Sequence, residues 1–287
     1  MELRRGAIGA TGIAYRVDGP DDAPAIVFIN SLGTDHRLWD AQVPAFVHDH
    51  RIVRFDFCGH GASAPPRGPA SIAGFGDDVV ALLDHLAIER AQVCGCSLGG
   101  MIALWLAAER PARIARAVLA NTGARIGTVE RWNARIEAVR RDGMEGVVDS
   151  VLARFFSAAF REREPGTVTR VGAMLRATDP LGYIAACEAL RDADLRGLVE
   201  RVRVPTLIVA GSLDESTPPS LAEQLQVGIV GSRLAIIPGA AHLANVERPD
   251  QFNALVVDFL SGARTLASTG VPASTPVPAS TKKGTAI

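Results

Sequence analysis

The sequence predicts an α/β domain with a mostly parallel central sheet, helices on both faces and an inserted helical cap. Three observations support this fold class. Short apolar runs alternate with longer amphipathic runs, the alternation stops between about residues 123 and 196, and it then resumes. Such alternation is typical of a parallel sheet covered on both sides, and 287 residues with 48 % hydrophobic content suffice for one large core.

Six short runs are apolar along nearly their whole length and rich in β-branched residues. This pattern favours strands that are buried on both faces, because a half-exposed strand would alternate apolar with polar residues. The predicted strands are residues 25–30, 51–55, 91–96, 114–120, 206–210 and 233–237.

Two stretches between these strands predict helices. In residues 77–86, apolar side chains from Val79 to Leu86 recur at i, i+3, i+4 and i+7. Residues 98–110 are mainly apolar and end before Pro111, which cannot continue a helix.

Residues 123–195 are helical by pattern and contain no predicted strand; one apolar stripe includes Trp132 and Ile136. We interpret this insertion as a cap over the carboxyl edge of the sheet, where ligands bind in open α/β sheets. The predicted division is therefore a core of residues 1–122 and 196–262 with the cap between its two parts.

The charge balance is even, with 30 Lys and Arg against 31 Asp and Glu. It gives no reason to expect nucleic acid or an anionic membrane as a partner, and self-association stays open. The longest apolar run, residues 101–108, is far shorter than the roughly 20 residues that span a bilayer. Residues 1–6 lack the apolar stretch of a signal peptide, so we expect a cytoplasmic protein. Residues 263–287 are mostly Ser, Thr, Ala, Pro and Gly, and we expect a disordered tail, with a binding role as the alternative.

The four cysteines are predicted to be small buried apolar residues rather than ligands or disulfides. A metal site would require Cys-x-x-Cys spacing and a second ligand pair, and the sequence has neither. We therefore expect no metal and no cofactor. The cysteines are Cys58, Cys94, Cys96 and Cys187.

The strongest chemical signal is Gly95-Cys96-Ser97-Leu98-Gly99, a G-x-S-x-G motif between a predicted strand and a predicted helix. In such a nucleophile elbow the serine has a strained backbone, and glycine is needed on both sides because side chains would clash. We predict Ser97 as the nucleophile. The alternative is a glycine-rich turn that carries a bystander serine.

A nucleophilic serine needs a base, and in the α/β-hydrolase fold the chain order is serine, acid, histidine. Asp214 follows the strand at 206–210, and His242 follows the strand at 233–237. Both therefore lie at the same sheet edge as Ser97. We predict Asp214 as the acid and His242 as the base, with Glu215 as the fallback acid.

The tetrahedral intermediate of such a reaction needs an oxyanion hole. One donor is predicted to be the backbone N–H of Leu98, directly after the nucleophile. The second comes from the loop after the first predicted strand, and we choose the N–H of Leu32.

At this point the sequence resembles a known family, the 3-oxoadipate enol-lactonases of aromatic degradation. The more specific parts are Asn-Ser-Leu-Gly-Thr at residues 30–34, where most α/β-hydrolases carry His-Gly, and Leu-Arg-Asp-Ala-Asp-Leu at residues 190–195. The resemblance covers roughly residues 10 to 260. Cys58 departs from the usual arginine, and Phe155 stands where the family's cap would have tryptophan.

The resemblance implies the cofactor-free opening of 3-oxoadipate enol-lactone to 3-oxoadipate. This substrate carries a free carboxylate, for which a bidentate arginine is the best partner. Arg135 lies three residues after Trp132 on one helix face, so we predict both as substrate-binding residues, together with Ser31. Arg131 and Arg125 are the next candidates for the carboxylate.

Competing interpretations share the same fold. A carboxylesterase or lactonase of broader specificity would have the same three catalytic residues without a carboxylate-binding cation. An acyltransferase would need an acceptor that outcompetes water. A non-catalytic ligand receptor would keep the pocket without turnover, which the complete set of Ser97, Asp214 and His242 disfavours.

Overall fold

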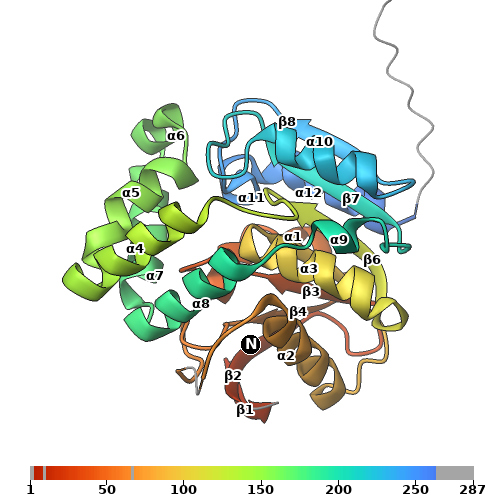
Figure 1. Cartoon of the computed structure of the whole chain (residues 1–287). Helices are drawn as coiled ribbons and strands as arrows, with labels where there is room; N and C mark the ends of the chain where they lie inside the picture. The colour runs from red at the N-terminus through yellow and green to blue at the C-terminus, as the bar shows by residue number, and fades with distance from the viewer. Residues whose placement is uncertain (1–2, 9–10, 66–67, 263–287) are drawn as a thin grey trace, which may run out of the picture.

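The computed structural model describes residues 3–8, 11–65 and 68–262. The predicted disordered tail at residues 263–287 lies outside the described residues. The described chain forms one eight-stranded sheet with the strand order β1-β2-β4-β3-β5-β6-β7-β8. Helices lie in front of and behind this sheet, and further helices form a separate layer beside it (Figure 1). The predicted α/β fold class is confirmed.

All six predicted strands are present within one residue of their expected ends. They pair in parallel, and β3 to β7 form the buried centre of the sheet, whereas β8 lies at one edge and is only partly buried, contrary to the predicted burial on both faces. They are β3 (Ala25–Ile29), β4 (Arg51–Phe55), β5 (Ala91–Cys96), β6 (Ile114–Ala120), β7 (Thr206–Gly211) and β8 (Arg233–Ile237).

Two further strands, β1 (Arg4–Ile8) and β2 (Thr11–Asp18), were not predicted. They add an antiparallel hairpin at one edge, where β2 also runs antiparallel to β4. The large apolar residues Ile13, Tyr15 and Val17 stand at every second position of β2 and are buried, as are the small Ala14 and Asp18. This alternation is typical of an antiparallel strand, and a search for continuous apolar runs overlooks it.

The core helices cover both faces of the sheet. The predicted helix at 98–110 is α3 (Leu98–Glu109), and that at 77–86 is the longer α2 (Ile72–His85), which begins where Ser71 caps Gly74. Figure 1 shows α2, α3 and α10 in front of the sheet and α12 behind it. The other core helices are η1 (His36–Trp39), α1 (Val43–Phe46), η2 (Pro111–Arg113), α9 (Arg196–Val199), α10 (Pro219–Gly228), α11 (Ala244–Glu247) and α12 (Pro249–Leu260).

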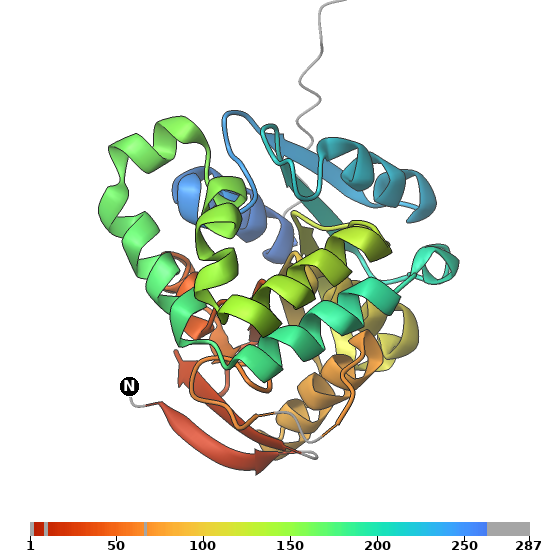
Figure 2. The same cartoon turned by 60° about the vertical axis from the view of Figure 1, so that its left-hand side comes forward.

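Five helices lie between β6 and α9, within the segment that was predicted as a cap. In Figure 2, α4 and α8 run side by side, and the helices between them form an arch at one side of the molecule. Trp132, Ile136 and Val139 are buried along α4, as their spacing predicts. The helices are α4 (Val129–Asp142), α5 (Glu145–Phe155), α6 (Ala158–Arg163), α7 (Pro165–Ala177) and α8 (Pro180–Asp192).

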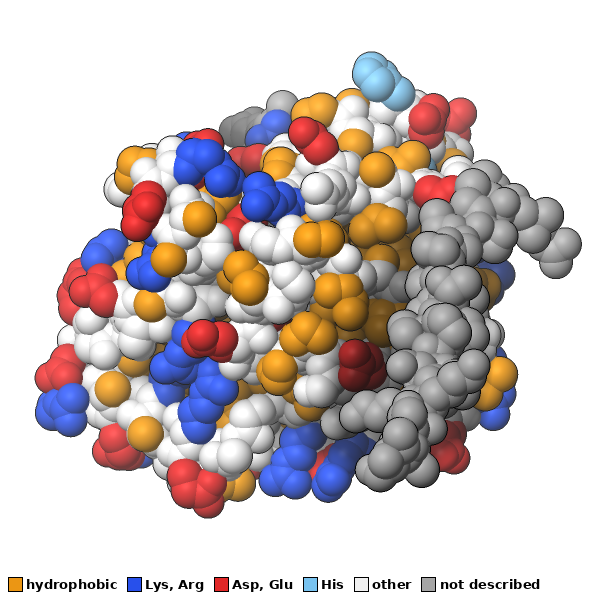
Figure 3. All heavy atoms as spheres, turned by 90° about the horizontal axis from the view of Figure 1, so that it is seen from above, with side chains coloured by type: hydrophobic (Ala, Val, Ile, Leu, Met, Phe, Trp, Pro, Cys, Tyr) orange, Lys and Arg blue, Asp and Glu red, His pale blue; other side chains and the backbone are white. Residues whose placement is uncertain are grey.

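The surface agrees with the even charge balance of the sequence. On the face shown in Figure 3, acidic and basic side chains lie interspersed, with apolar groups between them. Among the described residues, none of the helices has both the length and the apolar character needed to cross a membrane.

Candidate active site

Ser97 occupies a sharp turn between β5 and α3. Its backbone has φ 57° and ψ −113°, a left-handed conformation that costs energy for a residue with a side chain. A Cβ at Gly95 would lie 2.0 Å from the Gly99 carbonyl oxygen, and one at Gly99 would lie 2.1 Å from the Ile29 carbonyl oxygen. Glycine is therefore required on both sides of the serine, and the turn places Ser97 at the carboxyl edge of the sheet.

Asp214 lies in the loop after β7 and is held by five hydrogen bonds. Its Oδ2 accepts from His242 Nδ1 at 2.8 Å, Thr217 Oγ1 at 2.6 Å and Asn121 Nδ2 at 3.0 Å, and its Oδ1 accepts from the amides of Ser216 and Thr217. Burial raises the pKa of this carboxyl, but His242 and Thr217 outweigh it and lower the pKa to about 2. Asp214 is thus a buried anion at neutral pH.

His242 follows β8 and is 2 % exposed. Because Nδ1 donates its proton to Asp214, Nε2 is left as the acceptor that a general base needs. The Phe155 ring from the end of α5 stacks on the imidazole, with centroids 5.6 Å apart and planes at 25°. The fallback acid Glu215 is exposed beside this pair, and the histidine bonds Asp214 instead.

Ser97 and His242 line one small cavity, of about 20 Å³, beneath the cap helices. The predicted substrate residues Ser31, Trp132 and Arg135 line it as well. The structure therefore brings together residues from the ends of β3, β5 and β8 with residues of α4 and α5. The full lining is Ser31, Leu32, Ser97, Ile126, Arg131, Trp132, Arg135, Val151, Arg154, Phe155, Leu190, Ser216 and His242.

The two predicted oxyanion donors, the amides of Leu32 and Leu98, belong to segments that meet beside Ser97. Leu98 begins α3, so its amide has no partner within the helix. Neither amide donates one of the loop and turn hydrogen bonds found among residues 3–8, 11–65 and 68–262. Ser31 next to Leu32 is fully buried, and its hydroxyl has no hydrogen-bond partner among the residues that the structure describes. These three groups are free to bind a ligand oxygen.

Three arginines enter the cavity from the cap. Arg131 and Arg135 come from α4 and Arg154 from α5, and all three are half-buried. Arg135 lies over the Trp132 ring at 5.1 Å, and Trp132 Nε1 donates to the Ile126 carbonyl at 2.7 Å, which fixes the ring. Within the described part of the chain, none of these arginines forms an ion pair with a carboxylate.

The arginines also repel one another. Burial, followed by the charges of Arg154 and Arg135, lowers the pKa of Arg131, while the Asp214 carboxylate opposes this. Burial and Arg135 likewise lower the pKa of Arg154, opposed by Tyr183 and Glu215. A half-buried cluster of like charges that forms no direct ion pair within the described residues is suited to an anionic ligand, which would relieve the repulsion.

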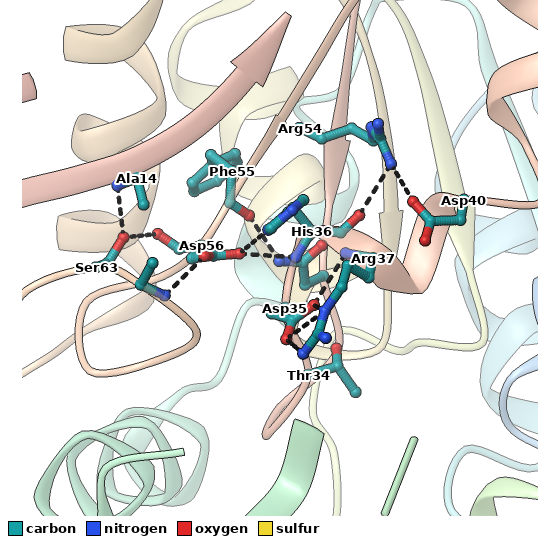
Figure 4. A network of polar contacts seen from close by, with 12 residues as sticks. Ala14, Thr34, Asp35, His36, Arg37, Asp40, Arg54, Phe55, Asp56 and Ser63 are labelled. Carbon is teal, nitrogen blue, oxygen red and sulfur yellow. Dashed lines mark hydrogen bonds and ion pairs between the residues drawn. The ribbon is translucent and has the colours of Figure 1, made fainter. Parts of the chain in front are cut away.

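A second polar cluster of His and Asp side chains lies at the carboxyl ends of β3 and β4. Ligand atoms of Asp35, His36 and Asp56 lie within 4.8 Å of one another. Spacing along the chain could not show this, because the loop after β3 meets the end of β4. Figure 4 shows that the oxygens are already used: Arg37 binds Asp35 with two nitrogens, and His36 donates to Asp56 from its amide and its ring. The cluster therefore fixes the loop that carries Ser31 and Leu32.

Comparison with known proteins agrees with this geometry. The family model described as the alpha/beta hydrolase fold matches residues 24–249. The chain belongs to the α/β-hydrolase family. Two curated relatives come from Acinetobacter baylyi. 3-Oxoadipate enol-lactonase 2 is 39 % identical over 83 % of this chain and 89 % of its own length. 3-Oxoadipate enol-lactonase 1 is 40 % identical over 84 % of this chain and 90 % of its own length. The solved enol-lactonase from Burkholderia xenovorans LB400 has a TM-score of 0.88 and 41 % identity, over 90 % of this chain and all of that one.

These comparisons confirm the predicted fold, the hydrolase class and the resemblance to the enol-lactonases. Sequence reasoning missed three residues of this α/β-hydrolase site: Thr217 and Asn121, which hold Asp214, and Arg154. A signal existed for the last, because Arg154 lies three residues after the buried Val151 and so shares its helix face.

Sequence reasoning also missed a connection between the cap and the histidine loop. Glu247 is 3 % exposed, and its carboxylate accepts from the amide of Ala241 at 3.0 Å, the amide of Ser157 at 3.3 Å and the Ser157 hydroxyl. The Leu243 amide donates to the Phe155 carbonyl at 3.0 Å. His242 is therefore fixed on both sides to the end of α5.

Proposed function

We propose that the protein is a serine hydrolase that opens 3-oxoadipate enol-lactone to 3-oxoadipate, a step of the β-ketoadipate pathway of aromatic degradation. The observation that carries the proposal is the cavity itself, which combines Ser97 and His242 with three arginines that lack carboxylate partners in the described chain. A neutral ester would leave that positive charge unmatched, whereas the lactone carries a carboxylate. The names of the relatives support the same substrate.

The proposed reaction begins when His242 Nε2 takes the proton of the Ser97 hydroxyl and Oγ attacks the lactone carbonyl carbon. The resulting oxyanion accepts hydrogen bonds from the amides of Leu32 and Leu98. When the intermediate collapses, the ring C–O bond breaks, and the enol oxygen receives the proton from His242. The product of this half-reaction is an acyl-enzyme whose free end carries an enol, which tautomerises to the ketone.

In the second half, a water molecule replaces the serine as the nucleophile. His242 takes a proton from the water, the hydroxide attacks the acyl carbon, and the proton returns to Ser97 Oγ as the ester bond breaks. Asp214 stays ionised throughout because of its low pKa, and it stabilises the imidazolium that forms in each half. Replacing Ser97 with alanine should abolish turnover, and full activity in that variant would disprove this mechanism.

Arg135 is proposed as the main partner of the substrate carboxylate, because Trp132 holds its guanidinium in place by stacking. Arg131 and Arg154 extend the same positive wall. Ser31 is proposed as a hydrogen-bond donor to the lactone, since its buried hydroxyl has no partner within the described part of the chain.

The alternative is a carboxylesterase or lactonase of broader specificity, with the same three catalytic residues. The two are separated by kcat/KM for the enol-lactone and for a neutral aryl acetate. A preference of roughly 1000-fold for the lactone, about 4 kcal/mol of transition-state discrimination, is expected. Equal or reversed rates would reject the enol-lactonase assignment and leave the serine hydrolase. A receptor without turnover would hydrolyse neither.

The remaining expectations are also proposals. A cytoplasmic location fits four cysteines that are buried and free. A small-molecule substrate without nucleic acid as partner fits the even charge balance, and self-association stays open. We propose the core and cap boundaries at residues 122/123 and 195/196 as predicted.

A further inference from the structure

A second, larger cavity adjoins the inner one. Its volume is about 430 Å³, it opens to solvent, and the two cavities share Arg131 and Ser216 in their walls. The wall is built from the segment between β6 and α4, from α9, and from the loop that follows Asp214. The lining residues that carry the argument are Arg125, Arg131, Arg196, Glu215 and Ser216.

The inner cavity is small in this structure. Its volume of about 20 Å³ is room for about one water molecule, whereas a lactone ring with a carboxylate arm is several times larger. A side chain in the wall must therefore move to admit the substrate. Arg131 is the cationic residue that both cavities share, and within the described residues no carboxylate pairs with it.

The rim of the outer cavity carries an excess of positive charge. Arg196 binds Asp194 with two nitrogens, and Arg125 lies 3.6 Å from the same carboxylate. The hydrogen bond from Arg196 lowers the pKa of Asp194 to about 2, so this one anion serves two guanidinium groups. Glu215 adds one negative charge to the wall, and Arg131 adds one positive charge. The lining residues themselves therefore carry three positive charges and one negative charge, while Asp194 and Glu130 act on Arg125 from beside the wall. The positive residues continue inward to Arg135 and Arg154.

We propose that the outer cavity is an anion-binding vestibule for small carboxylates, in which Arg125 and Arg196 bind a carboxylate group. Arg131 lines both cavities, so it contacts the carboxylate in the vestibule as well as in the inner cavity. The proposal rests on the proposed function and extends it to entry and release. Hydrolysis turns a monoanion into a dianion, because the second carboxylate forms at Ser97. The vestibule offers that dianion positive charge along its way out, and it concentrates the substrate anion by long-range attraction.

The test uses adipate as the probe, a linear dicarboxylate similar to the proposed product. Adipate should inhibit hydrolysis of a neutral aryl acetate, and its inhibition constant should rise about 5-fold between low and physiological ionic strength, because salt screens exposed charges. In the double variant R125Q/R196Q the constant should rise about 5-fold at low salt and depend less on salt. Arg170→Gln is the matched control, since this exposed arginine of α7 hydrogen-bonds Thr167 and lines neither of the two cavities.

Glu215→Gln tests the same electrostatic attraction by removing a negative charge from the vestibule instead of a positive one. Removing the opposing carboxylate should lower the inhibition constant of adipate by about 3-fold. Unchanged constants in both R125Q/R196Q and Glu215→Gln, relative to Arg170→Gln, would overturn the proposal. Calorimetric titration of adipate into each variant gives the same comparison without turnover. Failure of the proposed function would show separately, as the absence of a lactone preference in the unmodified protein.

Discussion

Replacing Glu247 should impair both stability and catalysis, and the size of both losses should depend on the replacement. Its carboxylate accepts three hydrogen bonds, two from main-chain amides and one from the Ser157 hydroxyl. In E247A the amides of Ala241 and Ser157 lose their acceptor. An unsatisfied buried group costs about 1–3 kcal/mol, so we expect a loss of about 3–5 kcal/mol in the free energy of unfolding.

The conservative variant should behave differently. In E247Q the amide oxygen can still accept from both main-chain amides, and the Ser157 hydroxyl can rotate to accept from the new NH2 group. All three hydrogen bonds survive, although they are weaker without the charge, and we expect a loss of about 1 kcal/mol. S157A removes the hydroxyl donor to Glu247 and also the N-cap acceptor of the Phe160 amide, and it should cost about 1–2 kcal/mol.

Activity should follow the same order, because the hydrogen-bonded segment is adjacent to the proposed base. If the Ala241 end of the loop is released, the His242 ring can shift relative to Ser97, and a displacement of about 1 Å costs up to about 100-fold in rate. We expect kcat to fall 10-fold to 100-fold in E247A with little change in KM, and E247Q to restore most of it. Urea unfolding and steady-state kinetics measure both quantities. A folded E247A protein with unchanged kcat would refute the reasoning, and equal losses in E247A and E247Q would show that charge matters rather than hydrogen-bond geometry.

Three further predictions concern the site and its elbow. The pKa of Asp214 falls from its ordinary 3.8 to about 2 on folding, so this group stabilises the fold by about 2 kcal/mol above pH 3.8, and that contribution should be lost as the pH falls from about 4 to 2. Urea unfolding of the protein and of D214N across this range measures the contribution, and identical pH profiles would contradict it. Gly95→Ala should lower the free energy of unfolding by several kcal/mol, because the new Cβ would lie 2.0 Å from a carbonyl oxygen. Gly166→Ala, with open space around it in α7, should instead raise the free energy of unfolding by about 0.5 kcal/mol. Thermal unfolding compares the two variants, and equal effects would contradict the steric argument. Arg154→Ala should lower the ratio of kcat/KM for the lactone to kcat/KM for a neutral aryl acetate by about 10-fold or more, because a positive charge is lost from the cavity. Arg170→Ala is the control, and an unchanged ratio would exclude Arg154 from the proposed carboxylate site.

The sequence predicts the sheet best where strands are buried on both faces. β3 to β7 are nearly continuous apolar runs, so their positions can be read without knowledge of their neighbours; β8 has a similar sequence although it lies at the edge and is only partly buried. The hairpin of β1 and β2 could not be found in this way, because an edge strand is specified by alternation and by the strand with which it pairs. The loop cluster of Asp35, His36 and Asp56 was hidden for a related reason, since its members meet only after β3 and β4 have paired.

Some residues of the candidate site could be predicted from the sequence, whereas others depend on contacts between distant segments. Ser97, Asp214 and His242 each follow a parallel strand, and the order of the strands alone brings them to one edge. The arginines depend on how the cap helices sit on that edge, which chain order does not determine. Two contacts fix α5 there, from Phe155 to Leu243 and from Ser157 to Glu247, and they link residues far apart in the sequence. For this reason a sequence of this kind predicts the proposed reaction chemistry more directly than the substrate. The core alone positions the proposed nucleophile, whereas the arginines proposed to select the ligand are positioned by a few contacts that become visible only in the folded chain.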